Sequence, residues 1–599
     1  MAVASAADKP NVLVFFVDDL GWTDWQHDPV LNPLGSPVYE TPNMLRLASE
    51  GVNFTNAYSS SPVCSPTRAS LLTGQTPARH DFTDHSGGGS NTSSTLRSPV
   101  FTRSVAGSDT TVAEALGSPA GGYDTGFVGK WHAGGSPTSH GFDFNIAGGG
   151  AGCPCDGEGG FFAGPDGRWN MPGLSTPGTY PSDAYLTDVL SGFAEDYITQ
   201  KAADPDPFFL MMAPYQVHVP LQAPADTINK YNLKISQLVG QGVDLRGHDN
   251  AIYAAMVEEM DTALGRALDR LDDPNNDGNT ADSIRDDTII VFASDNGGLT
   301  VSELGSAPAT DNSPLRSGKG SLYAGGIRTT FITSWTGNSQ IAQGTSTAAR
   351  VSTHDLYPTL LDLTGLKDDA SVPRNDVMDG VSFASALEGG SHDRGYQYFH
   401  YPHRSNQQKV GGGVVTGGSF VSAILDDDRK MIYFYETGSY EMYDLANDLG
   451  EANDLMGTDP MKAFEMSLEL HAYLKQVGAG LPINRFTGQP VDLPEVLWLT
   501  EQGDFTGDGI LDAADWQRLK TGFGVDVSSL DAVVAYRAGG DINLDGRVDR
   551  LDFAEFKTCF EAANGAGSFE AMLASVPEPT SGLLLVPAVA ACAGRRAAR

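Results

Sequence analysis

The chain has 599 residues, of which 40% are hydrophobic and 9% aromatic, so it can bury a sizeable core and its length predicts more than one domain. Its 38 Lys and Arg against 75 Asp and Glu give a formal net charge of −37. This balance argues against a nucleic-acid-binding protein, because phosphates require a basic face. It does not exclude an enzyme for anionic substrates, since a local cationic pocket or a bound metal can override the overall charge.

Residues 10–390 alternate between apolar strands and amphipathic helices. Continuous apolar runs predict buried strands at Asn11–Val17, Phe208–Ala213 and Thr288–Ala293. Before the last of these, Asn250–Leu271 carries apolar residues at helical spacing. This alternation predicts an α/β domain with a largely parallel central sheet flanked by helices.

Oxygen-bearing side chains follow two of these strands. Asp18 and Asp19 end the first strand, and Asp295 and Asn296 come directly after the third. Ligands gather at the carboxyl ends of parallel strands, and such oxygens suit hard divalent cations. One acidic pair alone is more often a turn or a helix cap, but two pairs in one domain make a metal site an equal alternative.

The segment from Cys64 to Gly74 combines the start of a helix with a permanent positive charge. Pro66 suits the first helical turn, and Ala69–Leu72 continue the helix. A helix N-terminus stabilises anions, and Arg68 adds a planar fork of donors. A lone cysteine is usually a small buried apolar residue, but the polar turn around Cys64 favours a functional role.

The chain has five cysteines, too few for a disulfide-built scaffold. Cys153 and Cys155, in a Gly-rich loop, could form a local bridge or part of a metal site. We favour the simpler interpretation of an irregular surface loop.

Residues 391–477 predict a smaller α+β subdomain, with strands at Val421–Leu425 and Met431–Tyr435 on either side of a turn. Its segment 396–408 is rich in polar and aromatic groups that suit an anionic sugar, and the candidate substrate-binding residues are His400, His403 and Arg404. An ordinary hairpin surface is the alternative. Residues 478–500 contain Pro and Gly and resemble a linker.

Residues 501–565 contain an internal duplication of an acidic loop. Calcium loops place oxygen ligands at positions 1, 3, 5, 9 and 12 and Gly at 6, and both copies fit this pattern with Asp at position 12. The expected ligands are Asp504, Thr506, Asp508, Asp512 and Asp515, then Asp541, Asn543, Asp545, Asp549 and Asp552. The duplication resembles a type I dockerin, which implies a small all-α module with two Ca²⁺ ions. Such a module binds a cohesin-like partner or is simply a Ca²⁺-folded module at the cell surface. A solvated acidic linker is the alternative.

Both ends of the chain carry features of export. Residues 1–9 have the small-residue texture of a signal-peptide cleavage region, and we interpret them as the remnant of a signal peptide. Residues 576–599 contain Val576-Pro-Glu-Pro579, a short apolar run and three arginines. They resemble a PEP-CTERM sorting tag, which implies an exosortase-like processing enzyme. The protein is therefore expected in the periplasm, at the cell surface or outside the cell of a Gram-negative bacterium.

The motifs of residues 10–460 resemble one enzyme family in order and spacing. Cys64-Ser-Pro-Thr-Arg68, followed by Ala-Ser-Leu-Leu-Thr-Gly, is similar to the signature of formylglycine-dependent sulfatases, which have the alkaline phosphatase fold. The other matching motifs are Asn11–Gly21, Val128–His132, His140–Asp143, Ala213–Pro220, Ser294–Gly297, Gly318–Gly326, Asp355–Leu361 and Glu441–Asp448. The resemblance covers about three quarters of the chain.

The resemblance implies a modified nucleophile beside a metal. In that family the cysteine is oxidised to formylglycine by a dedicated generating enzyme, and Cys64 matches its position. One divalent cation, usually Ca²⁺, would be held by Asp18, Asp19, Asp295 and Asn296 together with the residue at position 64.

The same resemblance assigns roles to five further residues. Arg68, Lys130 and Lys319 would spread positive charge over the sulfate oxygens. His132 would assist the formylglycine hydrate and the release of sulfate from the covalent intermediate. His218, together with Lys319, would stabilise or protonate the leaving oxygen.

Two positions depart from the family pattern. Ala324 stands where an acid is usual, which removes an expected hydrogen-bond acceptor and puts the tuning of Lys319 in doubt. Arg328 is followed by Thr329 and Thr330 where Val-Pro is usual.

The sequence thus indicates a sulfatase acting on sulfated polysaccharide or its fragments. A phosphoester or phosphonate ester hydrolase of the same superfamily is one alternative, because sulfate and phosphate esters share tetrahedral geometry. A catalytically silent scaffold protein that displays the dockerin-like module is another.

Overall fold

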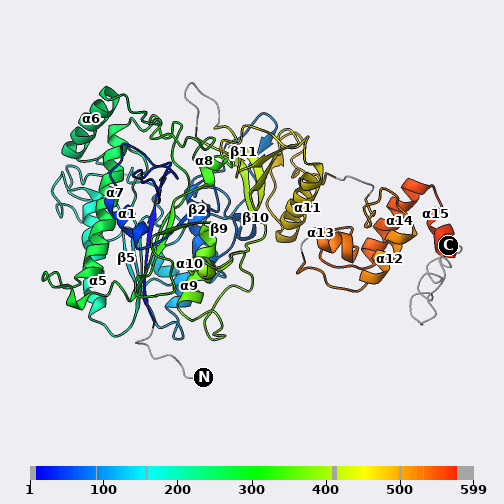
Figure 1. Cartoon of the computed structure of the whole chain (residues 1–599), viewed down its shortest axis with the longest axis horizontal. Coiled ribbons are helices and arrows are strands. Elements are labelled where there is room, and N and C mark those ends of the chain that lie inside the picture. Colours follow the sequence, from blue (N-terminus) through cyan, green and yellow to red (C-terminus); the bar gives the residue numbers. More distant parts are fainter. Residues whose placement is uncertain are drawn as a thin grey trace. The chain divides into compact units, whose positions relative to one another are not determined.

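The computed structural model describes residues 9–89, 91–155, 159–407, 415–497, 502–530 and 532–575. The chain divides into two compact units, which are described separately (Figure 1). Unit 1 comprises residues 1–459 and 477–495, and unit 2 comprises residues 460–476 and 496–599. The sorting tag predicted at 576–599 and residues 1–8 of the signal-peptide remnant lie outside the described residues.

Unit 1 is built on an eight-stranded sheet with the order β5-β4-β6-β1-β7-β8-β2-β9. All neighbours are parallel except β8, which runs antiparallel to β7 and β2. This confirms the predicted α/β class and the largely parallel sheet. The strands are β1 (Asn11–Val17), β2 (Gly51–Tyr58), β4 (Asp124–Gly129), β5 (Phe144–Ile146), β6 (Phe208–Ala213), β7 (Thr288–Ser294), β8 (Phe331–Ser334) and β9 (Thr345–Ser352).

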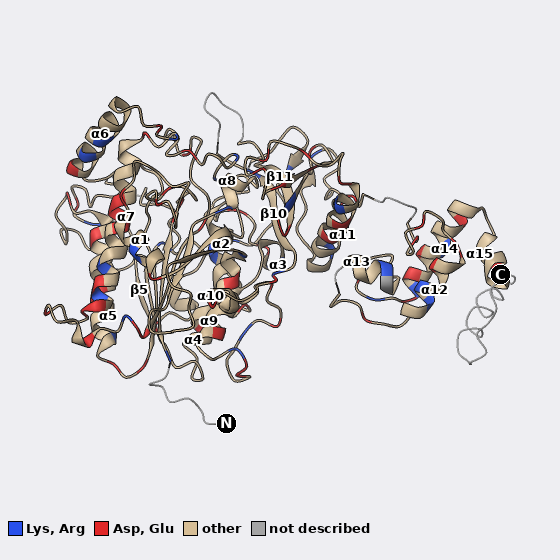
Figure 2. Ribbon diagram, in the orientation of Figure 1, with Lys and Arg blue, Asp and Glu red and all other residues tan. Residues whose placement is uncertain are grey.

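Helices cover both faces of this sheet. Leu13 and Phe15 of β1 pack into one hydrophobic cluster with α1 (Pro42–Ser49), α5 (Leu186–Ala202) and α7 (Ala251–Asp272). Val14 and Phe16 pack into another with α2 (Cys64–Thr73), α4 (Val112–Leu116) and α9 (Leu356–Leu363). Because alternate side chains point to opposite faces, β1 is buried on both, as its uninterrupted apolar sequence predicts. Charged residues lie along α5 and α7 (Figure 2).

A second sheet of unit 1 has four antiparallel strands in the order β10-β11-β12-β13. Its hairpin of β11 (Ser419–Asp426) and β12 (Arg429–Phe434) agrees with the predicted pair of strands. The other strands are β10 (Gln397–Arg404) and β13 (Ser439–Asp444). The remaining elements of unit 1 are α3 (Pro77–His80), β3 (Leu96–Arg97), α6 (Ala225–Gly240), α8 (Ala324–Ile327), α10 (Ala384–Leu387), β14 (Ile483–Asn484) and the 3₁₀ turns Pro137–Ser139, Thr280–Asp282 and Thr353–Asp355.

Unit 2 is helical. Its elements are α11 (Pro460–Val477), α12 (Ala513–Gly522), α13 (Ala532–Val534) with the turn Ala535–Gly539, α14 (Arg550–Asn564) and α15 (Ser568–Ser575). The predicted domain boundary at residue 477 differs from this division. Phe464 and Leu468 of α11 join the same hydrophobic cluster as Phe505 and Phe556, and the division therefore groups this helix with the acidic loops.

No helix within the described ranges is long and apolar enough to cross a membrane.

Candidate active site

The polar side chains that follow β1 and β7 meet at the carboxyl edge of the large sheet. These strands are parallel neighbours, with Val17 opposite Ser294, so Asp18, Asp19, Asp295 and Asn296 leave the sheet together. The backbone N–H of Asp19 donates to Asp295 Oδ1 at 3.2 Å, and Asn296 Nδ2 donates to Asp19 Oδ1 at 2.7 Å. The structure thus brings the four expected metal ligands into one buried cluster.

Cys64 begins α2 and faces this cluster. Its side chain is 4% exposed, and its Sγ lies within 4.8 Å of carboxylate oxygens of Asp18 and Asp295. Burial raises the pKa of the Cys64 thiol to about 11. An unmodified Cys64 is therefore a protonated thiol at neutral pH and a weak nucleophile.

Arg68 lies one helical turn beyond Cys64 in α2, and its guanidinium contacts the acidic cluster. Its Nε and Nη2 reach Asp295 Oδ2 at 2.9 and 2.8 Å. Its Nη1 donates to the carbonyl of Lys130 at 2.6 Å. A buried guanidinium thus faces both the acid after β7 and the backbone after β4.

Two buried lysines neutralise the acids after β1. Lys130 Nζ lies 2.6 Å from Asp18 Oδ2, and Lys319 Nζ lies 2.8 Å from Asp19 Oδ2. Burial alone would lower the pKa of each lysine, but the neighbouring carboxylates outweigh it and raise the pKa above its usual value. Both lysines are therefore cationic, and they bring two positive charges into this buried cluster.

The two predicted catalytic histidines are neutral at neutral pH. Burial, with the charge of Lys319, lowers the pKa of His218 to about 4, and burial beside Lys130 lowers that of His132 well below its usual value. His218 Nδ1 donates to the carbonyl of Val219 at 2.7 Å, which leaves Nε2 as an acceptor. His132 Nδ1 is buried and has no hydrogen-bond partner among the described residues.

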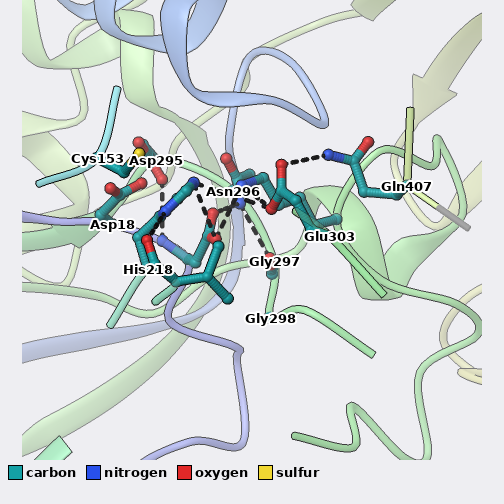
Figure 3. Close-up of polar contacts among 12 residues, drawn as sticks. Asp18, Cys153, His218, Asp295, Asn296, Gly297, Gly298, Glu303 and Gln407 are labelled. Carbon is teal, nitrogen blue, oxygen red and sulfur yellow. Dashed lines mark hydrogen bonds and ion pairs between the residues drawn. The ribbon is translucent and has the colours of Figure 1, made fainter. Parts of the chain in front are cut away.

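The structure adds an acid that the sequence analysis missed. Glu303 Oε2 lies 2.7 Å from Lys319 Nζ and 3.8 Å from His218 Nε2, and its Oε1 accepts from Gln407 Nε2 at 2.8 Å (Figure 3). Glu303 lies in the irregular chain between β7 and Lys319, where no periodicity or motif marked it. The backbone N–H of Ala324, the position without the usual acid, donates to Glu451 Oε2 at 2.7 Å.

Cys153 and Cys155 form a disulfide, so the interpretation as a plain irregular loop is wrong. Cys155 Sγ lies 3.8 Å from the carbonyl of Val219, next to His218. A Cβ on Gly152 would lie 2.7 Å from the ring of His132, so this loop requires glycine there. The bridge constrains a loop beside both histidines, a proximity that depends on the tertiary fold and that the spacing of the cysteines alone could not reveal.

The structure corrects two of the candidate substrate contacts. His400 is 2% exposed, with its nitrogens bonded to Ser422 Oγ and the carbonyl of Gly480. His403 is 0% exposed and bonded to Thr83 Oγ1. Both rings are held inside the protein and do not face a substrate. Arg404 is partly exposed, and its Nη1 donates to the carbonyl of Thr92.

The cluster around Cys64 fits a divalent cation. Asp18 Oδ1 and Asn296 Oδ1 are buried and have no hydrogen-bond partner in the described structure. Unsatisfied buried oxygens are costly, and two of them beside Asp295 and Cys64 form an oxygen-rich donor set. Such a set suits a hard cation such as Ca²⁺ better than a soft one.

The site combines an oxygen-rich cluster with a buried arginine, two charged lysines and two neutral histidines, all at the carboxyl edge of a parallel sheet. A protein of this class is a hydrolase of an anionic ester, because these cations would stabilise charge on the oxygens of a transferred group.

Comparisons with known proteins identify that ester. A family model described as "Sulfatase" matches residues 10–366, and one described as "N-sulphoglucosamine sulphohydrolase, C-terminal" matches residues 318–479. A sulfatase of Formosa agariphila is 32% identical over 520 residues, covering 78% of this chain and 89% of its own. Human N-acetylgalactosamine-6-sulfatase is 31% identical over 422 residues, covering 67% of this chain and 70% of its own.

Among solved structures, Ps i-CgsB is similar with a TM-score of 0.60 and 26% identity, covering 78% of this chain and 93% of its own. The chain belongs to the sulfatase family, and it is a hydrolase of sulfate esters.

Proposed function

We propose that this sulfatase works through a formylglycine hydrate at position 64 and removes sulfate from sulfated glycans or their fragments. The observation that carries the mechanism is the place of Cys64. A buried and protonated thiol at a helix start faces acids and cations that would hold a sulfate group. An oxygen nucleophile at this position would be far better suited to the site than the thiol.

Asp18, Asp19, Asp295, Asn296 and the modified residue 64 would hold one Ca²⁺. When bound, the cation would polarise a sulfate oxygen and favour deprotonation of the nucleophile. The unpartnered oxygens of Asp18 and Asn296 support this assignment.

Hydrolysis would take two steps, transfer of the sulfuryl group to the hydrate and release of sulfate, and side chains of the protein would assist both. Arg68, Lys130 and Lys319 would hold its oxygens while a hydrate oxygen bonds to sulfur and the bond to the leaving oxygen breaks. Lys319, with His218 beside it, would stabilise or protonate that leaving oxygen. His132 would then take the proton of the remaining hydroxyl, the carbon–oxygen bond to sulfate would break, and water would add to the restored aldehyde.

The mechanism is tested by the chemical state of position 64 and by the choice of ester. Mass spectrometry of the Cys64 peptide should show an aldehyde in active protein, and turnover of 4-nitrophenyl sulfate should exceed that of 4-nitrophenyl phosphate. Full activity with Cys64 as a thiol would refute the mechanism. Faster turnover of the phosphate would favour the phosphoester alternative, and no turnover of either would favour the scaffold.

The glycan substrate is supported by two names among the comparisons. The human relative is named for a sulfated amino sugar, and so is the model matching residues 318–479. The test is release of sulfate from a panel of sulfated glycans and oligosaccharides. Negligible release from all of them, alongside good turnover of an aryl sulfate, would refute the glycan assignment.

Residues 501–565 of unit 2 would form a dockerin-like module that binds two Ca²⁺ ions and a cohesin-like partner. Its loops are constructed alike, which supports a common ligand. Asp504 accepts from the N–H of Gly507 and Gly509, and Asp541 accepts from the N–H of Asp545 and Gly546. Isothermal titration of the purified protein with Ca²⁺ should find sites beyond the catalytic one, and these should disappear when the chain is truncated before residue 501.

The protein would be exported, modified by a formylglycine-generating enzyme and processed at its tag by an exosortase-like enzyme. Truncation after Ser575 leaves every proposed catalytic residue in place. The truncated protein should hydrolyse an aryl sulfate normally but be mislocalised in its host, and unchanged retention at the cell surface would contradict the tag.

A further inference from the structure

Lys319 is shared by two carboxylates in the active site. Its Nζ lies 2.8 Å from Asp19 Oδ2 and 2.7 Å from Glu303 Oε2, and the carboxylates approach it from different parts of the chain. Glu303 is only 8% exposed. A buried carboxylate requires such a partner.

Glu303 is itself held in place on its far side. Its Oε1 accepts from Gln407 Nε2 at 2.8 Å, and Gln407 Oε1 in turn accepts from Ser405 Oγ. Gly320, directly after Lys319, permits this approach, because a Cβ there would collide with the Ser405 and Gln407 side chains. Gly320 also has a φ of +82°, which favours glycine. The chain at 405–407 thus reaches the catalytic lysine through Glu303.

The second carboxylate changes what Lys319 can do. With Asp19 alone, the ammonium would be drawn onto an expected metal ligand and away from the substrate. With Glu303 on its other side, it is shared between two acids, next to His218 Nε2, which lies 3.8 Å from both Asp19 Oδ2 and Glu303 Oε2. Glu303 thus gives Lys319 a second carboxylate, which comes from the irregular chain after β7.

We propose that Glu303, supported by Gln407, is a positioning residue that holds the Lys319 ammonium, beside His218, toward the leaving oxygen of the sulfate ester. This inference rests on the proposed function, in which Lys319 and His218 act on that oxygen. It predicts that Glu303 matters most where the leaving group is poor, because a basic leaving oxygen depends most on a nearby cation or proton.

The test is a series of aryl sulfates whose leaving phenols range from acidic nitrophenols to unsubstituted phenol. In E303Q, kcat for phenyl sulfate should fall at least about tenfold more than kcat for 4-nitrophenyl sulfate. E303D should restore part of the loss, and Q407A should show the same trend with a smaller amplitude. E441Q is the matched control: Glu441 is bonded to Tyr323 and Tyr443 in the smaller sheet, and its profile should match that of the wild type.

Thermal unfolding separates this role from a structural one. Equal losses for every phenol in a folded E303Q would overturn the inference and leave Glu303 a stabilising residue. If E303Q does not fold, the same kcat series is measured with E303D and Q407A. Losses that do not depend on the leaving phenol in both variants would overturn the inference. If the wild type hydrolyses no aryl sulfate, the proposed function fails first and this inference fails with it.

Discussion

Acidic side chains cluster in both units, but they are balanced in different ways. In unit 1, Asp18 and Asp19 each face a buried lysine, and Asp295 faces Arg68. In unit 2, Asp541 and Asp552 are held by backbone N–H groups of their own loop.

This difference indicates what a metal would contribute in each place. In unit 1 the chain supplies most of the balancing cations itself, so a metal would mainly serve chemistry. The balance is incomplete at Asp18, because its Oδ1 has no hydrogen-bond partner and burial raises its pKa well above the usual value. In unit 2, burial and the charges of Asp552 and Asp545 raise the pKa of Asp541 to about 6. A cation there would relieve the repulsion, so its binding free energy would become folding free energy.

The largest expected effect is on catalysis in unit 1. Cys64→Ser should reduce turnover of an aryl sulfate by about a thousandfold or more, because a plain hydroxyl lacks the second oxygen that allows the aldehyde to be regenerated. Its thermal unfolding should match that of the wild type. Protein expressed without a formylglycine-generating enzyme should be equally inactive, with Cys64 a thiol by mass spectrometry. Sustained turnover by Cys64→Ser would contradict the elimination step.

The next effect concerns the cations that unit 1 provides. Lys130→Met should lower the free energy of unfolding of unit 1 by about 3 kcal/mol, because it leaves the fully buried Asp18 without its ion pair. Urea unfolding monitored in unit 1 would measure the change. The double variant with Asp18→Asn should recover part of the loss. Full rescue of Lys130→Met by Ca²⁺ would show that the metal, and not the lysine, supports this fold.

Removal of calcium should affect the stability of the two units differently. With a chelator, unit 2 should lose part of its helical circular dichroism and melt at a lower temperature, while the thermal transition of unit 1 persists and its sulfatase activity falls. A fragment covering 459–575 should gain helix with Ca²⁺ more completely than one covering 500–575, since the shorter one lacks Phe464 and Leu468 of the shared core. Identical spectra with chelator and with excess Ca²⁺ would contradict the calcium module.

The sequence predicted the parts of the site that depend on strand ends. Parallel strands that end together bring Asp18, Asp19, Asp295 and Asn296 to one edge of the sheet. The apolar runs and the polar residues that follow them are visible in the sequence, so this grouping could be predicted. The role of Glu303 depends on an irregular loop, whose course follows from tertiary packing and leaves no periodic signal.

For His400 and His403 the prediction was wrong, because it assigned a substrate-binding role to side chains that are buried. A polar segment suggested a surface, but most of β10 is buried, so its polar side chains find partners inside the protein. In each case the sequence shows the polarity of a face but not what covers it.

The smallest effect should be a pH dependence specific to metal-free unit 2. The pKa of Asp541 is about 6 in the folded module, above the ordinary value of 3.8. Between these values the folded state binds a proton that the unfolded chain has lost, so stability is greatest on the acid side and falls as the pH rises through 6. The melting temperature of unit 2 in chelator should therefore drop by a few degrees between pH 4.5 and pH 7.

With excess Ca²⁺ the sign of this pH dependence should reverse, because ligands must lose their protons to bind the metal. Asp541→Asn should flatten the dependence in chelator, while Asp526→Asn, an exposed acid of the same unit, should leave it unchanged. A melting temperature that rises with pH in chelator would contradict this prediction and show that the chain already compensates the acids of these loops.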